Sequence, residues 1–148
     1  MTRKLVSLFA ATAICSAAGP AFAGSMVTGL SDHLSATPDH YVGHCPGVVT
    51  FHGVVDVRGR FEDGQSVEIG YQFTRSDGAT GQNQFFSVNH AGPHDISETW
   101  TLGDPQQLPH FAGWEKFKAW VTDSGQHPPS LGDTFSNEAH FTLECRRG

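Results

Sequence analysis

Histidine, a side chain that can bind metal ions, is unusually frequent in this chain, with nine in 148 residues. His33, His40 and His44 lie close together before the first long alternating apolar stretch, and His90 and His94 flank an Ala-Gly-Pro turn. Neutral imidazole is a good ligand for copper and zinc. Their spacing matches no established metal signature. We treat these five as candidate metal ligands, with solvated loop and strand histidines as the competing interpretation.

Cysteine offers a second kind of chemistry. Cys15 falls in an apolar N-terminal run, which leaves Cys45 and Cys145 as a pair. An even pair in an exported protein predicts one disulfide. Closing a loop of 100 residues is worth roughly 4–5 kcal/mol in the chain-entropy model. No CxxC motif favours a metal-binding thiol pair instead.

Motifs for catalysis are absent from the sequence. There is no Gly-x-Ser-x-Gly elbow and no phosphate-binding glycine loop. Glu62 and Asp63 are adjacent on an expected turn, where solvated charge is the usual role of such a pair. The turn at 75–78 lacks the regularly spaced oxygens that calcium requires. We therefore expect no enzymatic activity, no catalytic residues and no cofactor.

The first 23 residues have the pattern of a cleaved signal peptide. Two basic residues precede an apolar run over 5–18, and the small residues at 21–23 suit a signal peptidase. The run is too short to span a membrane. A lipoprotein anchor at Cys15 is disfavoured because Ile14 and Thr12 stand where small and leucine residues are expected. We predict a secreted or periplasmic protein with no membrane anchor.

Cleavage would remove two of the nine Lys and Arg residues and none of the 15 Asp and Glu residues, which leaves a net charge of −8. Such an acidic chain without a Lys/Arg cluster argues against nucleic acid as a partner. The remaining 125 residues suffice for one domain, which we expect to be a monomer.

The elements that must position these side chains are strands. From Cys45 onward, Val49, Phe51, Val55 and Val57 alternate with a more polar face. Further alternating strands are expected at 67–74, 84–89, 94–102, 114–122 and 138–145. Glu98 is an exception on the face that Ile96, Trp100 and Leu102 share. No segment shows sustained helical periodicity.

This pattern predicts an all-β fold, a single antiparallel β-sandwich of about seven strands. The domain is expected at 45–148. Residues 24–44 are expected to form a leader or edge segment, in which Met26, Val27 and Leu30 could make a short edge strand.

The chain also resembles the immunoglobulin and fibronectin-III-like domains of uncharacterised exported bacterial proteins. The resemblance is carried by Cys45-Pro46, the strand and turn at 71–78, Thr99-Trp100-Thr101, Gly113-Trp114, Ser136-Asn137 and the closing stretch 139–145. It implies an immunoglobulin-like sandwich and no particular activity. If Cys45 begins the second strand of such a fold and Cys145 ends the last, their bond joins one rim of the sandwich and does not cross its centre.

We therefore expect a secreted non-enzymatic binding or structural module, with another protein or a surface glycan as its partner. Trp114 and Trp120 share a strand face with Lys116 and Lys118, which favours exposed rings, although core packing is the commoner role of large aromatics. The alternative is a small copper- or zinc-binding β-sandwich that uses the candidate histidines.

Overall fold

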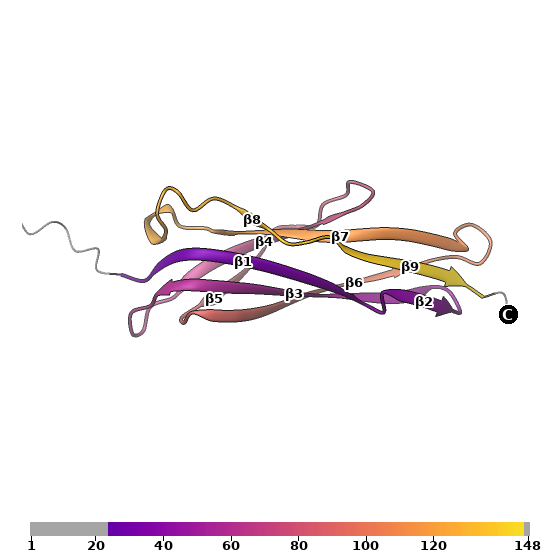
Figure 1. Cartoon of the computed structure of the whole chain (residues 1–148), viewed down its shortest axis with the longest axis horizontal. Helices are drawn as coiled ribbons and strands as arrows, with labels where there is room; N and C mark the ends of the chain where they lie inside the picture. The colour runs from indigo at the N-terminus through magenta and orange to yellow at the C-terminus, as the bar shows by residue number, and fades with distance from the viewer. Residues whose placement is uncertain (1–23, 147–148) are drawn as a thin grey trace, which may run out of the picture.

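The computed structural model describes residues 24–146. It is a sandwich of two β-sheets, drawn with its long axis horizontal in Figure 1. The three-stranded sheet has the order β1 (Met26–Thr37), β3 (Gly47–Arg60), β6 (Gly92–Leu102). The other sheet has the order β2 (His40–Gly43), β9 (Ala139–Cys145), β7 (His110–Val121), β4 (Val67–Arg75), β5 (Gln84–Val88), with β8 (Thr134–Phe135) paired to β7.

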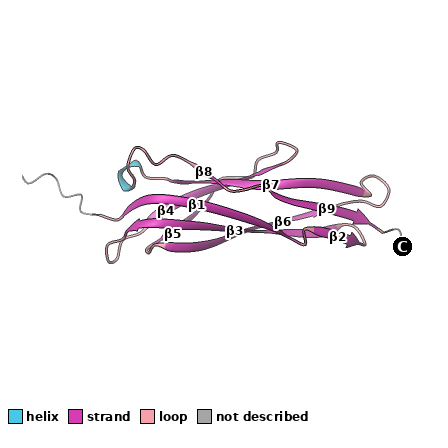
Figure 2. Ribbon diagram, in the orientation of Figure 1, coloured by secondary structure: helices cyan, strands magenta, loops and turns pink. Residues whose placement is uncertain are grey.

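The expected all-β immunoglobulin-like sandwich is confirmed, with one departure from antiparallel pairing. The short strand β2 runs parallel to β9, from His40 opposite Thr142 to Gly43 opposite Cys145. One turn of 3₁₀ helix, Ser124–Gln126, is the helical element among the described residues (Figure 2). Within that part of the chain no helix is long and apolar enough to cross a membrane. The predicted signal peptide, 1–23, lies outside the described residues.

The core forms between the two sheets as the alternation predicted. Val49, Phe51, Val55 and Val57 of β3 have no exposed surface. Phe51 packs against Trp100 of β6 and Phe141 of β9, with ring centroids 5.0 and 5.5 Å apart. This aromatic contact joins strands of both sheets, and tilted and edge-on ring pairs of this kind add to the stabilisation from buried area.

Of the two roles expected for residues 24–44, leader or edge segment, the structure has the second, because β1 and β2 each occupy the edge of a sheet. β1 pairs with β3 from Met26 opposite Arg60 to Thr37 opposite Thr50. Its side chains Val27, Leu30 and Leu34 are 0%, 6% and 1% exposed. The alternation was hard to recognise because the register shifts between Val27 and Gly29, and such a bulge reverses which side chains point inward.

The disulfide between Cys45 and Cys145 is present, with the Cα atoms 5.3 Å apart. Cys45 precedes β3 in one sheet and Cys145 ends β9 in the other, so the bond ties the two sheets at one rim. Gly103 (φ +97°) lies against it, and a Cβ there would come within 2.7 Å of Cys45 Sγ and 3.0 Å of Cys145 Sγ. Only glycine combines that backbone conformation with this close approach.

Replacing Leu34 with alanine tests whether β1 belongs to the core. Removing a fully buried leucine leaves a cavity, and we expect the free energy of unfolding to fall by about 2–5 kcal/mol. The measurement is urea denaturation followed by tryptophan fluorescence. His33→Ala, at an exposed position of the same strand, is the control and should change stability by about 0.5 kcal/mol or less. Equal effects of the two substitutions would restore the leader interpretation.

Candidate functional site

The candidate histidines do not assemble into a metal centre. His33, His40 and His44 are exposed on β1, on β2 and just after β2, and His40 Nδ1 bonds to the Thr142 hydroxyl. Over residues 24–146, no group of three or more His, Cys, Asp or Glu side chains is placed to hold a metal ion.

His90 and His94 are the two candidates that the fold brings together. Their rings stack with centroids 4.9 Å apart, and His94 Nε2 lies 3.3 Å from the carbonyl oxygen of His90. The Ala-Gly-Pro turn between them produces this stacking. Two imidazoles in contact, each bonded to a backbone carbonyl, make a closed local structure rather than an open coordination site.

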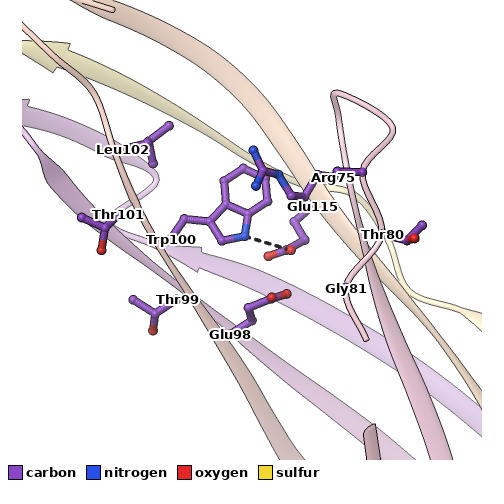
Figure 3. Close-up of a pocket in the computed structure, with 10 residues that line it drawn as sticks. Arg75, Thr80, Gly81, Glu98, Thr99, Trp100, Thr101, Leu102 and Glu115 are labelled. Carbon is purple, nitrogen blue, oxygen red and sulfur yellow. Dashed lines mark hydrogen bonds between the residues drawn. The ribbon is translucent and has the colours of Figure 1, made fainter. Parts of the chain in front are cut away.

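A pair of carboxyl groups facing the sandwich interior is the most unusual feature of the molecule. Glu98 of β6 and Glu115 of β7 point toward one another beside the Trp100 ring (Figure 3). The indole Nε1–H of Trp100 donates to Glu115 Oε1 at 3.0 Å. The other oxygen of each carboxyl, Oε2, is buried and has no donor among the described residues. Unpaired buried carboxylate oxygens are costly, so one of the two groups must hold a proton.

The glutamates line a cavity of about 320 Å³ at the side of the sandwich, between β6 and the end of β4. The chain after β4 turns back over this opening, because Arg75 N–H donates to the Ala79 carbonyl and Gly81 N–H donates to the Phe73 carbonyl. The pairing of the strands then places the residues that form two opposite walls of the cavity. Glu98 and Trp100 lie opposite Phe51 and Val49 in the β3–β6 ladder, and Glu115 lies opposite Arg75 in the β4–β7 ladder.

Burial raises the pKa of Glu115 to about 9, and the Glu98 carboxyl beside it acts in the same direction. The Trp100 hydrogen bond and the positive charge of Arg75 oppose this rise without cancelling it. Burial and the nearby Glu98 charge also raise the pKa of Tyr71 on β4. This rise favours the protonated form of Glu115 at pH 7.

Arg75 contributes to the same cavity from its outer side. Its guanidinium lies 4.4 Å from the centroid of the Trp100 ring, an arrangement that cation–π attraction favours. Its ion pair is with Asp77, at 2.8 Å. No ion pair joins Arg75 to Glu98 or Glu115 in the described part of the chain.

Sequence reasoning singled out Glu98 only as an unexplained exception and did not notice Glu115. The signal was available in the alternation of β7. Phe117, Ala119 and Val121 face inward, and Glu115 has the same parity. Two acidic residues on the inward faces of strands in opposite sheets predict a buried carboxyl pair.

A second surface of interest is the outward face of β7, where Trp114, Lys116, Lys118 and Trp120 follow one another. Lys116 Nζ lies 5.0 Å from the Trp114 ring centroid, and Lys118 Nζ lies 4.9 Å from the Trp120 ring centroid. This fits the expectation that lysine stems accompany partly exposed rings.

The Trp120 ring lies against Gly70 of β4, where a Cβ would meet it at 2.4 Å. Glycine at this position lets the ring lie close to the sheet. Phe85 of β5, 53% exposed, stands edge-on to it at 6.3 Å, and Phe135 of β8 is 64% exposed opposite Lys118. Trp114 and Trp120 are partly exposed and Phe85 is largely exposed, whereas Trp100 and Tyr71 are buried in the core, the role that large aromatics usually have.

Comparison with solved structures places the chain in a fold class. It is similar to the CARDB domain of a Pyrococcus furiosus protein, crystallised in complex with di-metal ions, at 13% identity and a TM-score of 0.51. The match covers 81% of this chain and 96% of that one. The fold is an immunoglobulin-like β-sandwich.

The other comparisons with known proteins do not identify a family for this chain. The DNA-bound alkylpurine DNA glycosylase AlkC of Pseudomonas fluorescens matches with a TM-score of 0.42 and 15% identity, over 80% of this chain and 31% of the glycosylase, which is too weak a likeness to carry an argument. No family model matches the sequence, and no curated protein matches it either.

The carboxyl pair makes the stability of the protein depend on pH. The folded state holds the Glu115 proton up to a pKa of about 9, whereas the unfolded chain releases it near 4.5. Stability should therefore decline as pH rises between these two values. Glu115→Gln keeps the Trp100 acceptor and has no proton to lose. At pH 8 we expect this variant to be more stable than wild type by about 1–3 kcal/mol, with little difference at pH 4.

Urea denaturation at several pH values measures this effect. Glu68→Gln makes the same chemical change at an exposed position of β4 and should leave the pH profile of wild type unchanged. A wild-type profile as flat as that of Glu115→Gln would show that Glu115 is ionised in the folded protein.

Proposed function

We propose that this chain is an exported, non-enzymatic binding module that holds a surface glycan against the outward face of β7. The observation that carries the proposal is the row Trp114, Lys116, Lys118, Trp120, in which two partly exposed indole rings are separated by two lysines. Export is supported by the N-terminal sequence pattern and by the disulfide, since disulfides persist in oxidising compartments.

The spacing of the rings suits an extended ligand. Six residues along a strand separate Trp114 from Trp120 by about 20 Å, a length that a chain of several sugar rings can span. Each indole offers an apolar surface on which the apolar face of a pyranose packs. Each lysine ammonium donates to hydroxyl or carboxylate oxygens between them.

A hollow beside Trp114 combines apolar surface with polar groups, as a sugar site requires. Its volume is about 410 Å³, and Asp39, Ser76, His140 and Thr142 line it together with the Trp114 ring. Sites of this kind combine an apolar wall with a few polar groups that fix the orientation of the ligand.

Binding without hydrolysis is favoured by the position of the acidic residues. Glycoside cleavage uses two carboxyl groups on either side of an open subsite. Glu115 is completely buried, and it faces the sandwich interior, on the opposite side of β7 from the tryptophans. The pair of glutamates that could do acid–base chemistry is therefore separated from the proposed glycan surface by the sheet itself.

Affinity electrophoresis of the mature protein through gels that contain neutral or acidic polysaccharides tests the proposal. We expect Trp114→Ala and Trp120→Ala each to weaken binding about tenfold or more, because each removes a stacking platform worth at least about 1.4 kcal/mol. Val48→Ala, which truncates a 48% exposed side chain on the outward face of the other sheet, is the control and should bind as wild type does.

The glycan proposal is refuted if no polysaccharide retards the protein. It is also refuted if wild type and both tryptophan variants are retarded equally. Binding to a protein partner that is lost in Phe85→Ala and Phe135→Ala but retained in Trp114→Ala would reassign the surface to protein recognition.

A further inference from the structure

The cavity beside the carboxyl pair has no role in the proposed glycan surface. It holds about 320 Å³ and opens on the flank of the sandwich. Glu115, completely buried, lines it with an oxygen that no N–H or hydroxyl group of the described residues reaches, and Glu98 presents a second; the Glu98 carboxyl itself hydrogen-bonds Glu115. Figure 3 shows the two carboxyl groups converging beside the Trp100 ring. Convergent unpaired acceptors at the base of a cavity are the expected features of a site that receives a donor.

We propose that this cavity binds the primary ammonium group of a small amine or lysine side chain, which replaces the proton shared by Glu98 and Glu115. On binding, the proton leaves to solvent and both carboxylates become ionised around the incoming cation. The local charge does not change, because one positive charge is exchanged for another.

An ammonium group fits these acceptors better than a metal ion does. It donates three hydrogen bonds, and three carboxyl oxygens remain to accept them, since Trp100 occupies only Glu115 Oε1. Calcium takes six to eight oxygen ligands, more than the two glutamates provide. The Trp100 ring adds an apolar wall for the methylene groups that carry the ammonium.

The chain's own cation does not already fill this position. Arg75 is held by Asp77 at 2.8 Å and stacked on Trp100. Arg75 is 44% exposed at its side chain, and Glu98 is half-buried. Both side chains line the cavity together with Glu115.

Proton exchange gives the proposal a distinctive signature. An amine with a pKa near 10.4 stays charged up to pH 9. Each bound ammonium displaces one proton from a site whose pKa is about 9. The association constant should therefore rise about tenfold for each pH unit between pH 6 and pH 8.

The experiment uses Nα-acetyl-lysine methylamide as the probe and Nα-acetyl-norleucine methylamide as its uncharged counterpart. Binding is followed by the NMR shift of the Trp100 indole N–H, which contacts Glu115 directly. We expect saturable binding of the lysine probe, no shift with the norleucine probe, and the tenfold dependence on pH. Glu98→Gln and Glu115→Gln should each weaken binding at least tenfold, whereas Glu68→Gln should not.

Several results would overturn the proposal: no saturable shift at pH 8, an association constant that does not change with pH, or equal binding of the norleucine probe. Calcium binding at the same resonance without lysine-probe binding would also overturn it. The pH dependence is measured on wild-type protein, so it decides the question even if a glutamate variant fails to fold. It is independent of the polysaccharide assay, because the tryptophan variants of β7 leave this cavity intact.

Discussion

The indole N–H of Trp100 imposes the constraint on which the interior of this sandwich depends. Trp100 packs between Phe51 and Phe141, at the contact that joins the two sheets, and a buried N–H without an acceptor would weaken that contact. Glu115 supplies the acceptor from the opposite sheet. The buried indole N–H of Trp100 thus requires the Glu115 carboxyl as an acceptor within the core, and that buried carboxyl in turn requires a proton or a cation.

The fold was largely predictable from the sequence because period-two alternation survives wherever apolar residues dominate one face. β3 is the clearest case, with its four inward side chains identified correctly. β1 was underestimated because a bulge near Gly29 reverses the alternation and Asp32 occupies an inward position between Leu30 and Leu34. The Thr134 hydroxyl of β8 donates to Asp32, a cross-sheet partner that local pattern cannot reveal.

The candidate site was less predictable because it depends on pairing between sheets. Glu98 and Glu115 are 17 positions apart and belong to different sheets, so their contact follows from layer packing and not from spacing. The histidines illustrate the opposite error. Their closeness in sequence suggested a shared site, but His33 and His40 lie at exposed strand positions and His44 in the exposed bend after β2, without a common centre.

The two faces of β7 carry side chains with different chemistry. Outward-facing residues carry rings and ammonium groups that can meet a ligand without distorting the fold, since each lysine is only loosely paired, at 3.6 Å to Glu138 and 3.8 Å to Asp133. Inward-facing Glu115 can change its charge only together with the packing around Trp100. A ligand on the outer face can therefore bind independently of pH-sensitive stability, whereas any ligand at the carboxyl pair is thermodynamically linked to both the proton and the fold.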